Sequence, residues 1–310
     1  MRRDPLSNVH WLSAALAASL AVPILVPLLR KRHACLWTVV WNFLVFIVMY
    51  AGELARPGLY MTVVYDLGFD TALVGDPSQW YRVLSAMYVH SGPLHLLMNM
   101  LILTLMGVPF EDRIATGRWL FIYLVSGAIG GVVDAGFAAA AHTSHVGIGA
   151  SGAIFGVMGA FAYMYPRDEI PMILGFIFLQ RVPVVWAVVF LGFLETIYLL
   201  GARDNIGHIV HVASLLAGIA LAVPVGALMK RRATGHTGTG LDLAALHELV
   251  HDDETSELYE KIHKEEIPEV RQAWLEQYIK KAQCPKCRRM LAHVPGRFFC
   301  SCGFKLKYLK

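Results

Sequence analysis

The chain has 310 residues, of which 56% are hydrophobic and only 16% are charged. Soluble globular proteins have about 25% charged residues, so this composition excludes an ordinary soluble protein and indicates an integral membrane protein with a smaller soluble part. The net charge of +4 does not indicate a nucleic-acid partner, because Lys and Arg beside membrane spans are expected on their cytoplasmic side.

Seven apolar stretches predict seven membrane spans. They cover residues 11–29, 36–52, 93–108, 119–140, 146–165, 184–200 and 206–229. The first stretch ends in a basic cluster and has no small-residue cleavage site after it. This pattern favours a membrane span over a cleaved signal peptide.

Basic residues follow a consistent pattern along these spans. They lie at residues 30–32, 113–118, 167 and 230–232. With alternating span directions, all four groups fall on one side of the bilayer, which is the cytoplasmic side in most membrane proteins. The sequence therefore predicts a multi-pass protein of the cell membrane with a cytoplasmic C-terminal tail.

Two stretches between the spans are expected to lie at the membrane surfaces. Residues 53–91 are too polar to cross a bilayer but rich in apolar and aromatic side chains, so we expect them to lie partly in the outer interface. The apolar run 170–180 is short for a span and is followed by Arg181 and Pro183. We expect it to form structure at the inner surface.

The end of the chain has a different composition. Residues 234–240 are rich in glycine and threonine and predict a flexible linker. The polar stretches 257–263 and 268–281 predict soluble helices, the second with an apolar face at a spacing of four residues. The tail is therefore expected to form a soluble region.

Four cysteines cluster beyond these helices. They are Cys284 and Cys287 in CPKC, and Cys300 and Cys302 in CSC. Two such short knuckles can supply four thiolates to one tetrahedral Zn²⁺, which is typical of a structural zinc ribbon in a reducing compartment. A redox pair is the alternative, and a catalytic zinc is not expected because four cysteines leave no open coordination position.

These observations predict an all-α polytopic membrane protein with four parts. The parts are an extra N-terminal transmembrane helix at 1–35, a six-helix core at 36–230, a linker with soluble helices at 231–282, and a zinc ribbon at 283–310. The basic residues near the ribbon are few and lack a stacking pattern, which argues against nucleic-acid binding. A cytosolic protein is the partner class expected for the ribbon.

Polar side chains occur at a similar depth in three spans that are far apart in the sequence. These side chains are His95, Asn99, Ser151 and His211. Each lies a few residues into a span that starts on the outer side, at a depth of about 3 to 10 Å for a helical rise of 1.5 Å per residue. Polar groups inside a membrane usually face the bundle interior or a wet cavity. We therefore expect one polar site near the outer face.

Ser151 lies among glycines at positions 149, 152, 156 and 159, which would let a neighbouring helix approach it closely. Close packing alone would explain these glycines. A serine beside an imidazole is, however, also the arrangement of a nucleophile and its general base. Ser151 and His211 fit these two roles, and His95 and Asn99, with the Ser151 amide, fit donors to a developing oxyanion.

No well-placed carboxylate is expected to orient this histidine. Asp134 and Glu195 lie on spans that run outward, and Glu195, although nearer the outer end, has no motif around it. The sequence therefore predicts a serine–histidine dyad rather than a triad.

Several short segments also occur in a characteristic order and spacing. They are Trp80–Arg82, HSGPLHLLMNM at residues 90–100, Gly107–Glu111 followed by Gly117, Gly149–Gly152, and a late-span histidine. In these segments the chain resembles the rhomboid family of intramembrane serine proteases, over about residues 36–229. The resemblance implies a six-helix rhomboid-like bundle, with Ser151 as nucleophile, His211 as base, and His95 and Asn99 as oxyanion donors. It also implies that the substrates are transmembrane segments of other proteins, cleaved near the outer face.

Three more residues enter through this resemblance. Phe155 matches an aromatic position that packs beside the histidine, and His90 and His208 remain as supporting residues. The chain departs from the family where Val-Ala-Ser follows His211 in place of the usual glycines. Choosing His208 as the base would put His211 and Leu215 at positions that need small side chains, so His211 is favoured.

Two other functions remain open at this stage. One is a non-catalytic rhomboid-like protein that binds membrane segments; loss of the serine or of both late-span histidines would have favoured it, and all three residues are present. The other is a zinc-dependent membrane scaffold, in which Ser151 serves only packing.

Overall fold

The structure is a computed structural model that describes residues 9–31, 33–174, 177–201, 207–237, 241–265, 268–294 and 296–308. The chain forms two compact units, Met1–Gly226 and Ala227–Lys310. We call them the membrane unit and the tail unit and describe each by itself.

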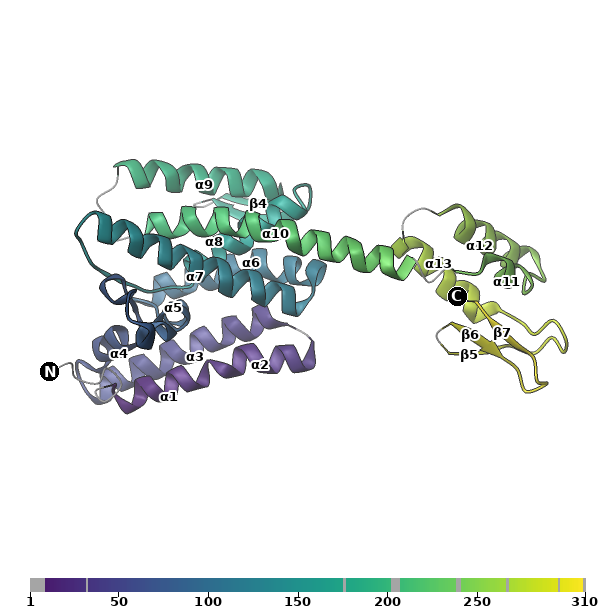
Figure 1. Cartoon of the computed structure of the whole chain (residues 1–310), viewed down its shortest axis with the longest axis horizontal. Helices are drawn as coiled ribbons and strands as arrows, with labels where there is room; N and C mark the ends of the chain where they lie inside the picture. Colours follow the sequence, from purple (N-terminus) through teal and green to yellow (C-terminus); the bar gives the residue numbers. More distant parts are fainter. Residues whose placement is uncertain are drawn as a thin grey trace. The chain divides into compact units, whose positions relative to one another are not determined.

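The membrane unit is a bundle of apolar helices (Figure 1). Its main helices are α1 (Trp11–Ser19), α2 (Ala21–Arg30), α3 (Ala34–Ala55), α6 (Pro93–Ile114), α7 (Thr116–Ala140), α8 (Ser151–Met164), α9 (Val184–Gly201) and α10 (His208–Thr237). Together they make this a polytopic, all-α membrane protein. The predicted outer turn at 201–205 lies mostly outside the described residues.

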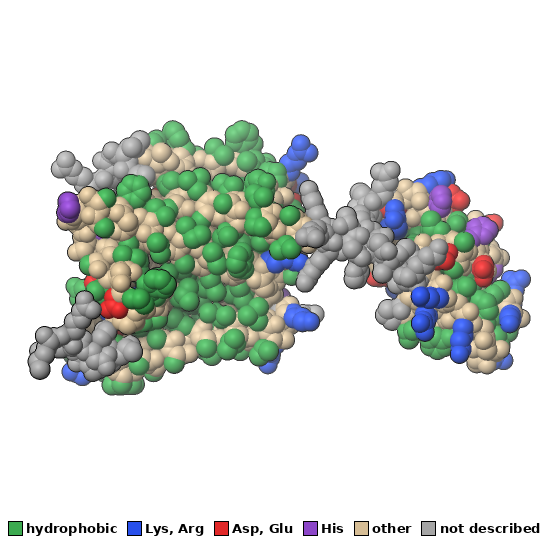
Figure 2. Space-filling view, viewed as in Figure 1, with side chains coloured by type: hydrophobic (Ala, Val, Ile, Leu, Met, Phe, Trp, Pro, Cys, Tyr) green, Lys and Arg blue, Asp and Glu red, His purple; other side chains and the backbone are tan. Residues whose placement is uncertain are grey.

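Each of the seven predicted spans contains an apolar helix. Five stretches are long and apolar enough to cross a bilayer; they are Trp11–Arg30, which comprises α1 and α2, then Ala34–Ala55, Pro93–Ile114, Thr116–Ala140 and His208–Met229. Ser151–Met164 and Val184–Ile197 are shorter apolar helices. The surface agrees with a membrane location, because hydrophobic side chains cover most of the visible face of this unit and Lys and Arg lie at its edges (Figure 2). Leu94, Trp186 and Phe193 are among the exposed apolar side chains.

The fifth span begins later than the sequence predicts. The prediction started it at Val146, but β2 (Val146–Gly147) pairs antiparallel with β1 (Phe69–Asp70). Gly149 has a φ of +117°, a conformation that ends the extended segment before α8 begins at Ser151. A short apolar run does not by itself distinguish strand from helix, which explains the error. Ser151 is therefore the first residue of its helix.

The segment between α3 and α6 is folded into short helices. These are α4 (Leu59–Leu67), η1 (Thr71–Leu73), η2 (Pro77–Gln79), α5 (Tyr81–Ser85) and η3 (Ala86–Tyr88). Arg82 braces the segment, since its Nε donates to Gln79 Oε1 at 2.6 Å and its guanidinium also bonds to the Tyr65 carbonyl. The Gly149 N–H donates to Ala86 O at 2.9 Å and so fastens this segment to the start of α8.

After α8, β3 (Glu169–Leu174) and β4 (Ile177–Pro183) pair antiparallel as the two strands of a hairpin. The sequence correctly predicts that the apolar run 170–180 is not a membrane span. Nothing in its pattern, however, indicated that it would form strands.

Glu111 is a buried carboxylate that braces the bundle. Its Oε1 accepts from the Ala34 N–H and from Thr116 Oγ1, and its Oε2 accepts from the Cys35 N–H, each at 2.8 Å. The N–H groups at the start of a helix have no partner within the helix, and a carboxylate there also complements the helix dipole. Glu111 thus ties the start of α3 to the end of α6.

Glycines bring α8 and α10 into backbone contact. A Cβ at Gly218 would lie 1.9 Å from Gly156 O, and a Cβ at Gly159 would lie 2.3 Å from Leu215 O. Ser214 is fully buried, and its Oγ would meet a Cβ at Gly130 of α7. Only glycine fits at such distances, which confirms the close helix approach expected from the sequence and fixes how α10 presents its histidines to α8.

Gly218→Ala is expected to force α10 away from α8, because the new methyl group would meet backbone rather than a movable side chain. We expect the free energy of unfolding to fall by about 2 to 4 kcal/mol, measured in detergent micelles by denaturant titration. Gly136→Ala on α7 is the control, since a Cβ there meets nothing within 4 Å; it should be neutral or slightly stabilising. Equal stabilities of the two variants would contradict the contact.

The tail unit joins three helices to a small sheet. The helices are α11 (Leu243–His247), α12 (Asp253–Lys264) and α13 (Pro268–Lys281), and the antiparallel strands are β5 (Ala292–Val294), β6 (Arg297–Phe299) and β7 (Lys305–Lys307). Leu246, Tyr278 and Phe298 pack in one core, and Tyr278 Oη donates to Leu246 O at 2.7 Å. The helices and the small sheet therefore share a single core.

The structure confirms both predicted tail helices and corrects the linker. α12 begins at Asp253, earlier than predicted, because Asp252 and Thr255 form a reciprocal N-terminal cap. α10 continues to Thr237, so the flexible linker predicted at 234–240 is wrong over its first four residues. Residues 238–240 lie outside the described residues.

Candidate functional site

Ser151 and His211 lie in direct contact, although 60 residues separate them. His211 Nε2 is 2.7 Å from Ser151 Oγ. Ser151 begins α8, and His211 lies in the first turn of α10, where its N–H donates to Gly207 O. The Phe155 ring stacks on the His211 ring with centroids 4.6 Å apart and planes 14° apart. The glycine contacts between the two helices hold this geometry.

The pair faces a cavity of about 460 Å³. Ser151, His211 and His95 line it, together with Phe69, Asp134 and His145. Cavities of this size hold small ligands or several side chains of a peptide. Asp134 Oδ2 lies 2.7 Å from His145 Nε2, so its carboxylate already has a partner.

His95 lies in the cavity close to the backbone that precedes Ser151. A Cβ at Gly149 would lie 2.8 Å from His95 Nε2, so this approach needs glycine. His95 Nδ1 lies 3.0 Å from Ser91 Oγ. If Ser91 donates to Nδ1, then Nε2 carries the hydrogen and can serve as a donor on the Ser151 side.

Asn99 is placed differently from His95. Its Nδ2 donates to His95 O, one turn earlier on α6, at 2.9 Å. Asn99 is not among the described residues that line the cavity. The amide has a second N–H, so the observed bond does not use up its donors.

His90 supports the loop before the nucleophile. It is 1% exposed, and its Nε2 accepts from the Ala150 N–H at 3.4 Å. Burial, with a smaller effect from the neighbouring His95, lowers the pKa of His90 to about 3. The ring is therefore neutral at physiological pH, as an acceptor at Nε2 requires.

The structure corrects the expectation that no carboxylate lies near the base. Glu195 Oε2 on α9 is 2.9 Å from His211 Nδ1 and 2.6 Å from His208 Nδ1. The contact to His211 has ion-pair length but lacks the alignment of a hydrogen bond. His208 therefore belongs to the site through Glu195, while the contact with Ser151 is made by His211.

Glu195 was rejected as a site residue for lack of a motif, although the sequence carries a signal for it. Glu195 lies shortly before the outer turn predicted at 201–205, and His208 and His211 lie shortly after it. Residues on either side of a turn between antiparallel helices share a depth in the membrane. Glu195 is therefore expected at the same depth as the serine and the histidines, which is the signal that it belongs to the site.

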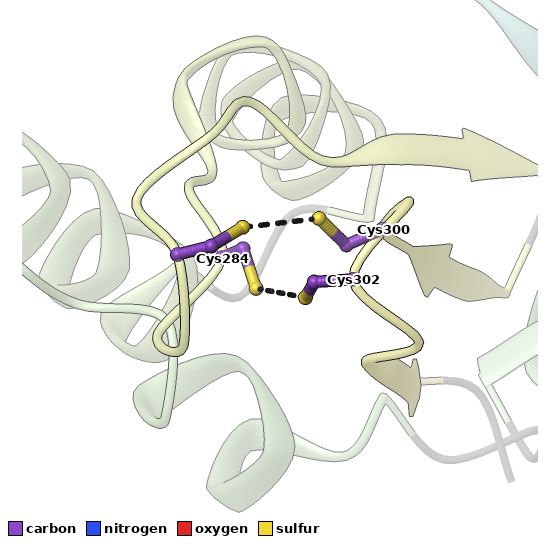
Figure 3. Close-up of side chains that lie close together, drawn as sticks. Cys284, Cys300 and Cys302 are labelled. Carbon is purple, nitrogen blue, oxygen red and sulfur yellow. Dashed lines mark hydrogen bonds between the residues drawn. The ribbon is translucent and has the colours of Figure 1, made fainter.

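The four tail cysteines form a separate cluster. The Sγ atoms of Cys284 and Cys302 are 3.5 Å apart, those of Cys287 and Cys300 are 3.4 Å apart, and all four lie within 4.8 Å of one another. Figure 3 shows the side chains of Cys284, Cys300 and Cys302 pointing toward a common centre. None of the cysteines is in a disulfide.

These distances fit a metal centre. Four thiolates at the usual Zn–S length of about 2.3 Å lie about 3.8 Å apart in a tetrahedron, close to the separations observed. The donor set also suits zinc, since four cysteines are typical of closed structural sites. The cluster could therefore hold a metal ion.

Comparisons with known proteins agree with the architecture. The rhomboid domain family model matches residues 77–228. Rhomboid protease GluP of Bacillus subtilis is 32% identical over 203 residues, which cover 62% of this chain and 38% of that protein. RHOMBOID-like protein 4 of Arabidopsis thaliana is 38% identical over 92 residues, covering 30% of this chain and 22% of that protein. Rhomboid-type serine protease 2 of Emericella nidulans is 29% identical over 149 residues, covering 48% and 27%.

The chain thus spans well under half the length of each of these relatives. The matched region includes α8 with Ser151, α10 with His208 and His211, and the glycine contacts between these two helices. On this basis the chain belongs to the rhomboid family.

Proposed function

We propose that this protein is an intramembrane serine endopeptidase that cleaves transmembrane segments of other membrane proteins near the outer face of the membrane. The observation that carries the proposal is the 2.7 Å contact between Ser151 Oγ and His211 Nε2 at the edge of a cavity. The names of the relatives, which include a rhomboid protease and a rhomboid-type serine protease, support the same class of activity.

In this proposal His211 takes the Ser151 proton as Oγ attacks the carbonyl carbon of the scissile peptide bond. The same proton then goes to the leaving nitrogen as the C–N bond breaks. A water molecule hydrolyses the acyl-enzyme with His211 again as base. Each transfer uses Nε2, the ring nitrogen that contacts the serine.

The developing oxyanion needs donors near Ser151. The Ser151 N–H lies at the start of α8, where helical N–H groups have no partner within the helix. His95 lines the same cavity, and we assign it the second donor role. Asn99 would join them through its remaining N–H, with His90 and Phe155 supporting the loop and the base.

For the tail unit we propose a structural zinc ribbon, held by Cys284, Cys287, Cys300 and Cys302. The bound ion would cross-link two loops that the small sheet alone holds weakly. The basic residues flanking the spans support a cytoplasmic tail, where thiols stay reduced. A cytosolic protein is the partner class that this location favours.

Cleavage in a defined bilayer tests the main proposal. The full chain is reconstituted in liposomes with a reporter protein that has one transmembrane segment, and the products are mapped by mass spectrometry. We expect a single cut near the outer end of that segment. A protein that binds the reporter but never cuts it would instead be the non-catalytic rhomboid-like protein.

A further inference from the structure

His211 has a second ring nitrogen whose role the contact with serine does not explain. To take the Ser151 proton, Nε2 must be unprotonated, so the neutral ring carries its hydrogen on Nδ1. Nδ1 is buried and makes no aligned hydrogen bond among the described residues. A buried N–H without an acceptor costs about 1 to 3 kcal/mol. The oxygen beside it, at 2.9 Å, is Glu195 Oε2.

Glu195 is itself held in place by a second imidazole. His208 Nδ1 lies 2.6 Å from the same oxygen. The side chains of Glu195, His208 and His211 are 18%, 7% and 9% exposed, so the cluster is largely shielded from water. A carboxylate in such surroundings acts strongly on a neighbouring charge, because little solvent screens it.

We propose that Glu195 is a positioning residue: it holds His211 in the Nδ1–H tautomer and stabilises the imidazolium that forms when Nε2 takes the Ser151 proton. His208 fixes the orientation of the Glu195 carboxylate. The inference rests on the proposed function. It extends the serine–histidine pair to a system of Ser151, His211 and Glu195. During the transfer the Nδ1 hydrogen stays on nitrogen and Glu195 stays ionised, so one proton moves from Oγ to Nε2.

A metal ion is not needed to explain this cluster. One ligand atom from each of the three side chains lies within 4.8 Å of the others, which would also suit a metal. Ligand atoms at about 2.0 to 2.1 Å from one zinc ion are, however, about 3.3 Å apart in a tetrahedron. The observed 2.6 and 2.9 Å are shorter and match direct imidazole–carboxylate contacts.

The titratable groups around His211 come from several elements. They are Glu195 on α9, His208 on α10, His95 on α6, and Asp134 and His145, which line the same cavity. Asp134 is paired with His145. Glu195 is thus the carboxylate in contact with the base, and removing its charge should change how the base titrates.

Glu195→Gln tests the proposal because it keeps the shape of the side chain and removes the charge. We expect kcat for reporter cleavage to fall by about 10²- to 10⁴-fold, with little change in KM. The acidic limb of the rate profile should move to lower pH, since a protonated His211 loses its counter-charge. Labelling of Ser151 by a fluorophosphonate should show the same shift without any peptide substrate.

Two variants serve as references for this experiment. Glu195→Asp keeps the negative charge on a side chain that is one methylene shorter. Compared with Glu195→Gln, it should have a higher kcat, and the acidic limb of its rate profile should lie closer to the wild-type pH. Glu169→Gln removes an exposed carboxylate that pairs with Arg181 on the β3–β4 hairpin, and should leave the profile unchanged.

The outcomes separate this inference from the proposed function. A Glu195→Gln variant with wild-type rates and profile would overturn the positioning role. So would a slower variant with an unmoved acidic limb, because that result indicates a purely structural contact. If the wild type itself neither cleaves the reporter nor reacts with the fluorophosphonate, the proposed function fails before Glu195 is tested.

Discussion

Ser151→Ala is expected to abolish reporter cleavage, with a loss of at least about 10⁴-fold, and to abolish labelling by a fluorophosphonate. The substitution removes the only atom that forms the acyl bond in the proposed reaction. It should not unfold the protein, because alanine is well tolerated in the first turn of a helix. Cleavage is measured in liposomes and labelling by gel fluorescence.

Ser126→Ala is the matched control for this loss. Ser126 is a buried serine on α7 whose Oγ donates to Ile122 O within its own helix. Its removal should leave labelling and cleavage within about twofold of wild type, since such back-bonding contributes little. Persistent labelling of the Ser151→Ala protein would place the nucleophile elsewhere.

The two late histidines give a second comparison at the same site. His211→Ala should be as inactive as Ser151→Ala, because residues that act as a unit lose nearly all activity when either is removed. His208→Ala should retain measurable activity, since His208 acts only through Glu195. An inactive His208 variant beside an active His211 variant would reverse the assignment of the base.

If the tail cysteines hold zinc as proposed, removing the ion is expected to unfold the tail unit and to leave cleavage of the reporter unchanged. Structural zinc contributes about 10 to 16 kcal/mol of apparent binding free energy in small zinc-finger peptides, more than a domain of this size gains from its core. Cys284→Ser should therefore lower the zinc content of the purified protein from one ion per chain and expose the tail to limited proteolysis. Elemental analysis and a protease time course measure both effects.

Cys35→Ala is the control for the tail cysteines. Cys35 is buried in the membrane unit, where its Sγ donates to Leu103 O at 3.3 Å. This variant should keep its zinc and an intact tail. Loss of reporter cleavage on chelation would favour the alternative in which zinc supports a scaffold function.

The helical part of the fold follows from composition. Apolar stretches of spanning length have few alternatives in a bilayer, because backbone groups there must be hydrogen-bonded within the segment. The same reasoning failed at the start of α8, where residues 146–147 pair with a segment more than seventy residues earlier. Such pairing depends on a distant partner, which local periodicity does not show.

The candidate site was predictable to a similar extent. A shared depth and close helix packing brought Ser151 and His211 together in the prediction, and the structure has them in contact. Glu195 was not accepted as the carboxylate that orients the histidine, because no motif surrounds it in the sequence. In the structure, the side chain of Glu195 on α9 faces α10 and contacts His211. The rotation of a helix about its axis depends on packing against its neighbours, and a nearly uniform apolar sequence carries little information about it.

The length of α8 has a consequence for hydrolysis. A helix of 14 residues rises about 21 Å, about 9 Å less than the hydrocarbon thickness of a typical bilayer. Arg167 follows the C-terminal end of α8, and a basic residue favours the cytoplasmic surface, so we expect the shortfall at the opposite end, where Ser151 starts the helix. We therefore expect water to reach the Ser151 hydroxyl at this end of α8, while the longer neighbouring helices still span the hydrocarbon layer.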